Sequence, residues 1–307
     1  MSAAPAVTAI RSVELGVNDL DASSAFYQDT WLLDEVARTP SAVYLRGTGP
    51  EHHVLAIHAG RGFGLVRINL AARDRAAVDA LHDALDGVTT IVHAPRDLDE
   101  PGGGYAFAFT DAEGREFRIV AGIPENPYAG EHSPDRPGKI SHVVLNAEAT
   151  SASAPLFCEK LGFRLRDQTG RANFIGCNAD HHSLAFGRVG GTALNHVAFE
   201  VPTLDGEMRA AGRMKRGGHP IEWGVGRHGP GHNVFAYFVD PNGYAIEYTT
   251  EMDQVDDATY VPGTPETWKR APHSDAWGLA EPPTERFKDA ITGKLGAEIS
   301  GKLGVPC

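Results

Sequence analysis

Hydrophobic and polar positions alternate along four segments of the chain, residues 11–17, 64–70, 141–146 and 195–201. Each segment is rich in Val, Leu, Ile or Phe, and a period of two is typical of β-strands. A helical stretch follows each segment, and after it come short apolar runs separated by Gly-, Pro- and Asp-rich turns. The candidate helix caps are Asp19 or Asp21, Asp74, Ser153 and Thr203. The pattern therefore predicts a β-α-β-β-β unit of roughly 60 residues that occurs four times.

The second half of the chain repeats the first. His53 in HHVLAI and His182 in HHSLAF are separated by the same interval as Asp111 and Asp240. An interval that is kept over about a hundred residues indicates a duplication. A Pro- and Gly-rich stretch, residues 122–138, separates the two copies and is typical of a domain boundary.

These units predict an α+β fold of four βαβββ modules. We expect the modules to pair into two domains, each an incomplete barrel-like mixed sheet with outer helices. We expect a first pair of modules without a metal site at residues 1–125 and a linker at 126–137. A second, catalytic pair of modules with a metal site is expected at 138–252, and a carboxy-terminal arm at 253–307. The arm is predicted to be extended, with a short helix from Thr284 to about residue 299, and it is a candidate lid over a pocket.

Charge and composition narrow the classes of partner. The 307 residues carry a formal charge of −12, which argues against a nucleic-acid surface or a polybasic membrane anchor. No apolar run approaches the ~18 residues of a membrane span, and the amino terminus lacks the pattern of a secretory signal. Three scattered cysteines, Cys158, Cys177 and Cys307, are typical of free thiols in a reducing compartment. We expect a cytoplasmic protein with a small-molecule partner, no nucleic acid and no membrane.

Three residues in the second half form a candidate metal site. His142 lies on the first strand of the third unit, His196 on the first strand of the fourth unit, and Glu247 on the last strand of the fourth unit. Val144 and Ala198 share the faces of the two histidines, and such modest side chains suggest a cavity. Two imidazoles and one carboxylate are the ligands of a non-heme Fe(II) facial triad, and Mn(II) has similar ligand preferences.

The duplication offers an internal comparison for this site. The fixed interval predicts Val13 and Arg118 as the first-half counterparts of His142 and Glu247. A small insertion between the opening strands makes Leu65 the predicted counterpart of His196, and these three residues make no plausible iron site. Taken singly, each second-half residue is more typical of a hydrogen-bonded core position or a surface position. The metal hypothesis therefore depends on the three residues together.

His182, His228 and Tyr237 are candidates for acid–base work beside the metal site. An imidazole titrates near neutral pH, and a phenol donates a hydrogen bond to an oxyanion. Paired strands and a short loop can bring all three around one pocket. The alternatives are a structural His182, a surface His228 in its Gly-rich loop and a Tyr237 that only packs its strand. His181 and His232 are interpreted as supporting or surface groups.

Five segments together carry a resemblance to a known family: HVVLN, HHSLAF, NHVAFEV, GRHGPGHNVFAYF and DPNGYAIEYTTE. They resemble the type I extradiol ring-cleaving dioxygenases of the vicinal oxygen chelate superfamily. The similarity is strongest over residues 138–252, and the repeat extends it to residues 8–122. It implies that the two histidines and Glu247 of the candidate site bind Fe(II), with Mn(II) as the other ion considered. It also implies that His182, His228 and Tyr237 are the second-sphere catalytic set.

The activity implied by this resemblance is extradiol cleavage of a substituted catechol by O2, in the degradation of aromatic compounds. Both oxygen atoms would enter one product of the 2-hydroxymuconic-semialdehyde type. The alternative is a metal-dependent glyoxalase-like isomerase or lyase of the same fold, which would neither consume O2 nor need the catalytic set. A ligand-binding protein of the antibiotic-sequestering type would lack metal ligands throughout, which suits only the first half.

The resemblance also implies a homo-oligomer. Substrate contacts are expected from Val144, Ala198 and Trp223 and, if the arm folds over the pocket, from Trp268 and Trp277. The sequence leaves open which catechol is bound, on which side of the diol the ring opens, and how many subunits assemble.

Overall fold

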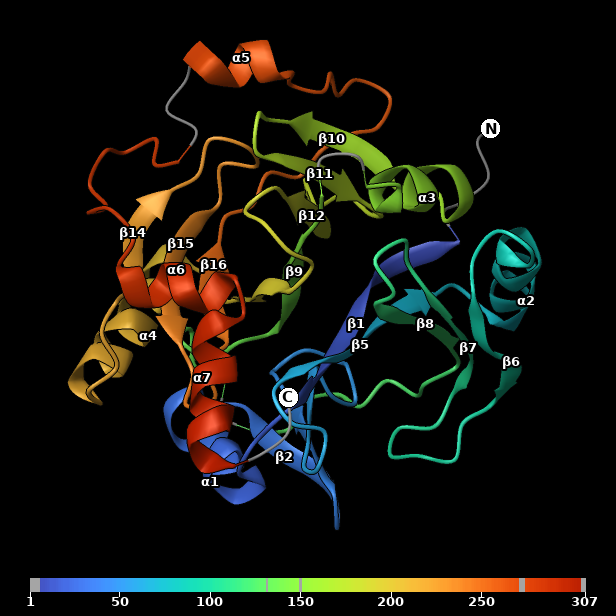
Figure 1. Ribbon diagram of the computed structural model, residues 1–307, viewed down its shortest axis with the longest axis horizontal. Helices are drawn as coiled ribbons and strands as arrows, with labels where there is room; N and C mark the ends of the chain where they lie inside the picture. Colours follow the sequence, from blue (N-terminus) through green and yellow to red (C-terminus); the bar gives the residue numbers. More distant parts are fainter. Residues whose placement is uncertain (1–5, 131, 149–150, 271–273, 305–307) are drawn as a thin grey trace.

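The computed structural model describes residues 6–130, 132–148, 151–270 and 274–304. Each half of the chain forms one eight-stranded mixed sheet (Figure 1). The first sheet contains β1 (Val7–Gly16), β2 (Asp34–Thr39), β3 (Ala42–Arg46), β4 (Leu55–His58), β5 (Gly64–Ala72), β6 (Ile91–Asp97), β7 (Tyr105–Thr110) and β8 (Glu116–Ala121). The second contains β9 (Lys139–Asn146), β10 (Arg164–Gln168), β11 (Ala172–Gly176), β12 (Leu184–Gly187), β13 (Leu194–Glu200), β14 (Trp223–Arg227), β15 (Val234–Val239) and β16 (Ala245–Thr250).

The two sheets have the same strand order. It is β2-β3-β4-β1-β5-β8-β7-β6 in the first and β10-β11-β12-β9-β13-β16-β15-β14 in the second. Each run of four strands belongs to one module, and the two modules of a sheet join through the antiparallel pairs β1–β5 and β9–β13. The prediction of four βαβββ modules in two unclosed mixed sheets is confirmed.

Three of the four predicted helices begin after their predicted capping residues, whereas Ser153 is itself the first residue of its helix, and no side chain caps that helix. Asp19, Asp74 and Thr203 each accept a hydrogen bond from a backbone amide in the first turn of the helix that follows, at 2.9, 2.7 and 3.0 Å. The helices are α1 (Leu20–Ala25), which continues as the π-helix η1 (Phe26–Thr30), α2 (Arg75–Leu85), α3 (Ser153–Lys160), α4 (Leu204–Arg216), α5 (Pro265–Arg270), α6 (Glu285–Ile291) and α7 (Lys294–Leu303).

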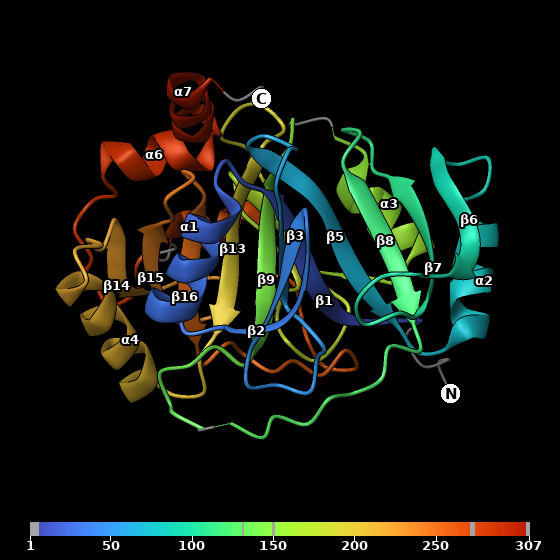
Figure 2. The ribbon, with the colours of Figure 1, turned by 90° about the horizontal axis from the view of Figure 1, so that it is seen from below.

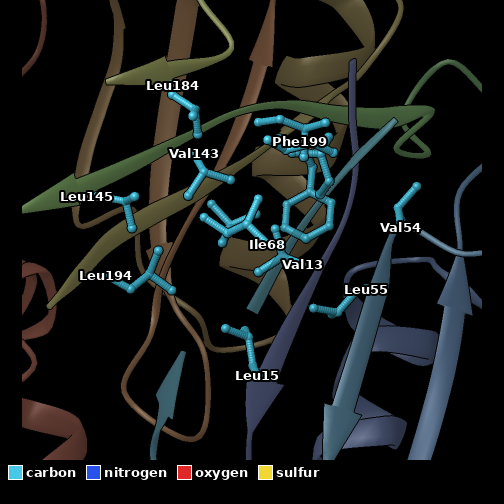
Figure 3. Close-up of a cluster of buried hydrophobic side chains, with 14 of the residues drawn as sticks. Val13, Leu15, Val54, Leu55, Ile68, Val143, Leu145, Leu184, Leu194 and Phe199 are labelled. Atoms are coloured by element: carbon cyan, nitrogen blue, oxygen red, sulfur yellow. The ribbon is translucent and has the colours of Figure 1, made fainter. Parts of the chain in front are cut away.

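The hydrophobic core is continuous across the two halves. Figure 3 shows Val13 and Ile68 of the first half in one cluster with Val143 and Phe199 of the second. Because the cluster joins both sheets, burial of apolar side chains holds the halves together.

Two helices pack against the opposite half. Trp31, which follows η1, stacks on Tyr248 of β16 with 3.7 Å between the ring centroids, and α1 lies beside the second sheet in Figure 2. In the other direction, Phe157 of α3 lies edge-on to Phe117 of β8, at 4.8 Å. The stretch between β8 and β9 has neither helix nor strand among its described residues. The division of the chain at 126–137 stays a prediction from the sequence.

The carboxy-terminal arm differs from the prediction. Instead of one helix from Thr284 to about residue 299, it forms α6 and α7, which meet at Gly293. Gly293 has a positive φ of 77°, a conformation that favours glycine and ends the first helix. Thr284 does cap α6, because its hydroxyl accepts a hydrogen bond from the Phe287 amide at 3.1 Å. The sequence does not predict α5.

Two other predictions concern the thiols and the membrane. Cys158 and Cys177 are free, and Cys307 lies outside the described residues. Among the described residues, no helix is both long and apolar enough to cross a membrane.

Candidate metal centre and its pocket

Three strands bring the candidate metal ligands around one small side chain. His142 of β9 and Glu247 of β16 both lie opposite Ala198 of β13, and His196 stands two residues before Ala198. The Nε2 atoms of His142 and His196 lie 3.3 and 3.1 Å from Oε2 of Glu247. All three donor atoms lie within 4.8 Å of one another. Atoms that bind one ion at about 2.1 Å each are spaced in this way.

Neighbouring polar side chains orient the two imidazoles. Nδ1 of His196 lies 2.8 Å from Oδ1 of Asn195, and Nδ1 of His142 lies 3.2 Å from Oγ of Ser141. An amide oxygen only accepts, so Nδ1 of His196 carries the proton and Nε2 keeps its lone pair. The serine hydroxyl can accept from His142 in the same way. Such partners are typical of metal-binding histidines, because they fix the tautomer and the ring orientation.

The donor atoms fit a divalent cation. Nε2 of His196 and Oε2 of Glu247 are buried and have no hydrogen-bond partner among the described residues. Buried polar atoms without a partner cost free energy, which a cation between them would recover. Burial alone would raise the pKa of Glu247, but His142 and His196 hold that pKa below its ordinary value. Two neutral imidazoles and a carboxylate suit Fe(II) or Mn(II).

A mostly apolar cavity of about 230 Å³ is lined by the two histidine donors, His142 and His196. Val144 and Trp223 line it, as the sequence predicts. Ala198 is buried among the three ligands and is not part of the lining.

The prediction that Trp268 and Trp277 line the pocket is wrong. Trp277 is 39% exposed and its ring lies 4.8 Å from the guanidinium carbon of Arg227, outside the cavity. The Trp268 ring packs beside Gly263. The arm does reach the cavity, but through Ser274 and through residues of α6. The reason is that α6, rather than the extended part of the arm, docks against β13 and β15 (Figure 1).

The candidate acid–base residues line the same cavity. Nδ1 of His228 lies 3.0 Å from the carbonyl oxygen of Ser274, and Nε2 lies 2.9 Å from the hydroxyl of Tyr237. The carbonyl only accepts, so Nδ1 carries the proton and Tyr237 donates its hydroxyl hydrogen to Nε2. Burial lowers the pKa of His228 to about 4 and raises the pKa of Tyr237 well above its ordinary value.

His182 completes the set. Its ring centroid lies 4.5 Å from that of His142, and its side chain lines the cavity. Burial is the main cause that lowers the pKa of His182 well below its usual range, and the neighbouring His142 adds to it. Five of the six candidate residues thus line one cavity, and the sixth, Glu247, is buried next to the two histidine donors.

Other residues that line the cavity are not marked by any pattern in the sequence. Phe174 of β11 and Phe287 and Ile291 of α6 complete the apolar wall. Helix α6 is fixed from two sides: Asn146 donates to the Ile291 carbonyl at 2.6 Å, and the buried Glu222 accepts from Thr284 and Arg286 of the helix. The capping pattern could locate this helix along the chain, but only tertiary packing shows where it docks.

Strand pairing corrects the first-half counterparts of the ligands. Asn69 of β5 lies opposite Ser12 and Arg118, as Ala198 lies opposite His142 and Glu247. The counterparts are therefore Ser12, Arg67 and Arg118, and the predicted Val13 and Leu65 are wrong. The loop between β3 and β4 is one residue longer than the loop between β11 and β12, so the fixed interval that relates the later strands of the two halves does not hold for β1 and β9.

The first half fills the corresponding place with an ion-pair network. The carboxylate of Glu14 lies 2.9 Å from His58, 3.2 Å from Arg67 and 3.1 Å from Arg118, and Asn69 donates to it at 3.0 Å. Burial alone would raise the pKa of Glu14, but these partners lower it to about 2. The group is a charged anchor in a half without a metal-ligand cluster among its described residues.

This network predicts a pH-dependent stability effect for Glu14→Gln. A carboxyl with a depressed pKa stabilises the fold above its unfolded pKa, and that contribution is lost as the pH falls toward the folded pKa. The unfolded value is about 4.5 and the folded value about 2. We expect the loss of unfolding free energy in Glu14→Gln to be about 2 kcal/mol smaller at pH 3 than at pH 7. Urea unfolding of both proteins measures it, and an equal loss at the two pH values would contradict the network's role.

Comparisons with known proteins assign the family. The model of the glyoxalase/bleomycin resistance protein/dioxygenase superfamily matches residues 139–248. A solved structure, the Mn(II)-bound glyoxalase from Novosphingobium aromaticivorans, is 35% identical, with a TM-score of 0.85 over 92% of this chain and 94% of that one. The chain belongs to this superfamily.

Two curated relatives are named for ring cleavage. The chain is 30% identical to metapyrocatechase 2 of Cupriavidus necator over 122 residues, which are 39% of this chain. It is 30% identical to an iron-dependent extradiol dioxygenase of Rhodococcus jostii over 180 residues, which are 53% of this chain. The matches span only 38% and 58% of the length of these relatives.

Proposed function

We propose that this chain is an extradiol dioxygenase that uses O2 and a bound divalent ion, Fe(II) or else Mn(II), to open the ring of a substituted catechol. The observation that carries the proposal is that His182, His228 and Tyr237 line the same cavity as His142 and His196, the two histidines of the three-residue metal cluster. The similarity to proteins named as metapyrocatechase and extradiol dioxygenase supports it. The product would contain both atoms of O2, so no external reductant is required.

The three donors would hold the ion on one face and leave the cavity side to ligands. Bound there by His142, His196 and Glu247, Fe(II) or Mn(II) would supply Lewis-acid binding of the two catechol oxygens and electron transfer to O2. The flat, apolar walls suit an aromatic ring, because Trp223 and Tyr237 lie nearly parallel to each other at 5.2 Å.

The acid–base residues would then orient the substrate and move its protons. Tyr237 donates to His228, so its oxygen keeps lone pairs that can accept the hydrogen of a catechol hydroxyl. The Ser274 carbonyl fixes the ring of His228. His182 lines the cavity beside His142 and is the residue that would take up a proton at Nε2 and return it to the opening ring.

A glyoxalase-like isomerase is the second candidate. The specific observation in its favour is the 35% identity, over nearly the whole chain, to a structure named as an Mn(II)-bound glyoxalase. Parallel assays of one metal-loaded preparation separate the two. A dioxygenase consumes O2 with a catechol, whereas a glyoxalase-like isomerase converts the thiol adduct of an α-ketoaldehyde without O2. Isomerisation without O2 uptake from any catechol would contradict our proposal.

The position of α6 predicts an effect on substrate size. Phe287 packs against Tyr237, with 4.9 Å between the ring centroids, and forms part of the cavity wall. Because Phe287→Ala would remove a ring from that wall, we expect the ratio of kcat/KM for a bulky 3-substituted catechol to kcat/KM for catechol to rise about tenfold. Trp277→Ala, in the same arm but outside the cavity, is the control. A ratio that stays at the wild-type value in Phe287→Ala would remove α6 from the substrate pocket.

A further inference from the structure

His182 contacts a second buried imidazole. Nδ1 of His182 lies 3.0 Å from Nδ1 of His181, and the two rings are perpendicular, at 88°. One of these facing nitrogens must donate and the other accept. Among the described residues no hydrogen bond engages Nε2 of His182, and its ring lines the cavity. The tautomer of His182 therefore depends on what the far side of His181 contacts.

The far side of His181 contacts a buried carboxylate. Nε2 of His181 lies 3.2 Å from Oδ2 of Asp167 and 2.9 Å from the hydroxyl of Tyr260. That hydroxyl lies 3.2 Å from Oδ1 of Asp167, to which the Gly263 amide also donates, at 2.5 Å. Asp167 and His181 are both almost completely buried.

These contacts select one arrangement of protons. A carboxylate only accepts, so Tyr260 donates to Oδ1 of Asp167, and Nε2 of His181 donates to the other carboxylate oxygen and to the phenol oxygen. Nδ1 of His181 then carries a lone pair and accepts from Nδ1 of His182. As a result, Nε2 of His182 has a lone pair that is open to the cavity.

The first half supplies an internal contrast. His52 and His53 form the same contact, with 3.0 Å between their Nδ1 atoms. The paired imidazoles are thus a feature of the repeated module itself. The counterpart of Asp167, however, is Ala37. Asp167 lies opposite Phe174 of β11, and Ala37 lies opposite Tyr44 at the corresponding place of β3. The carboxylate that orients the pair is present only in the half with the metal ligands.

We propose that Asp167, Tyr260 and His181 are positioning residues that hold His182 in the tautomer with the proton on Nδ1 and the free lone pair on Nε2. Neither Asp167 nor Tyr260 touches the cavity, and they act through His181. Tyr260 and Gly263 belong to the carboxy-terminal arm, which therefore also serves as a clamp on Asp167. The consequence for turnover rests on the proposed dioxygenase function, whereas the tautomer does not.

Nitrogen NMR tests the tautomer directly. In ¹⁵N-histidine-labelled protein loaded with diamagnetic Zn(II), the side-chain signals of His182 are assigned by their loss in His182→Gln. We expect a protonated Nδ1 and an unprotonated Nε2 in the wild type, and a mixture of tautomers in Asp167→Asn and in His181→Leu. A proton on Nε2 in the wild type, or an unchanged tautomer in both variants, would overturn the proposal whatever the enzyme's activity.

Kinetics test the consequence. We expect Asp167→Asn to lower kcat for a catechol by about 10–100-fold with little change in KM or in bound metal, as partners of catalytic groups typically do. His181→Asn, which keeps an acceptor beside His182, should retain more of kcat than His181→Leu. His52→Gln changes the equivalent pair of the first half and is the matched control, with an expected wild-type kcat. Equal losses in His181→Asn and His181→Leu would mean that His181 acts by packing alone.

The outcomes separate this proposal from the proposed function. A wild-type protein that cleaves no catechol but shows the expected NMR tautomers would contradict the dioxygenase assignment and keep the positioning role. If the wild type cleaves catechol and both Asp167→Asn and Tyr260→Phe keep the wild-type kcat, the dioxygenase assignment is kept and the positioning role in turnover is contradicted.

Discussion

Replacement of Glu247 by Gln is expected to weaken metal binding by more than ~100-fold, because it removes the only charged donor of the site. Glu247 is fully buried, and its Oε2 lies 3.1–3.3 Å from both histidine donors. The amide would place either a neutral oxygen or an N–H donor against the ion. Calorimetric titration of metal-free protein with Mn(II), together with the iron content of purified protein, measures the effect.

A matched variant controls for the loss of a carboxylate in general. Glu116→Gln makes the same change on β8, the first-half strand that corresponds to β16, and removes one ion pair with Arg67. Its affinity for Mn(II) should equal that of the wild type. If Glu247→Gln still bound one equivalent of Mn(II) with wild-type affinity, the three-residue site would be wrong.

The second large effect is expected for His182→Gln. The variant removes the imidazole that would move protons but none of the three donors, so we expect kcat to fall by about 10²–10⁴-fold with the metal retained. His53→Gln is the matched control, because His53 holds the same place in the first half, beside its own imidazole partner. A His182→Gln protein with wild-type kcat would show that His182 has no part in the chemistry.

Most of the fold and the three candidate metal donors could be predicted from the alternating pattern of the strands. A period of two put His142, His196 and Glu247 on strands of neighbouring modules, and the pairing of β9, β13 and β16 brings them together around Ala198. The modules could be recognised because the same alternation, caps and turns recur four times in the chain.

Features that depend on register and docking could not be predicted. The loop between β3 and β4 is one residue longer than the loop between β11 and β12, so the interval that aligns His53 with His182 pairs His142 with Val13 instead of Ser12. The arm offered several aromatic residues, and the sequence favoured Trp277, which lies outside the pocket, over Phe287, which lines it. The difference arises from contacts of α6 with Glu222 and Asn146, distant residues that no local pattern connects to the arm.

The role of Asp167 was missed for a related reason. Asp167 lies on β10, fourteen positions before His181. The two are in contact because the chain reverses direction between β10 and β11, which pair antiparallel. Its partner Tyr260 comes from the arm, beyond the last strand. A sequence pattern identifies residues that carry chemistry more readily than those that orient them, because orientation is set by tertiary contacts.

The most direct test of the account is the stoichiometry of O2 consumption by protein loaded anaerobically with Fe(II), or with Mn(II), and given catechol, 4-methylcatechol, 2,3-dihydroxybiphenyl or a carboxylated catechol. We predict that at least one of them consumes one O2 per molecule and yields a yellow ring-opened product that contains both oxygen atoms. Metal-loaded protein that consumes no O2 with any of these catechols would contradict the account.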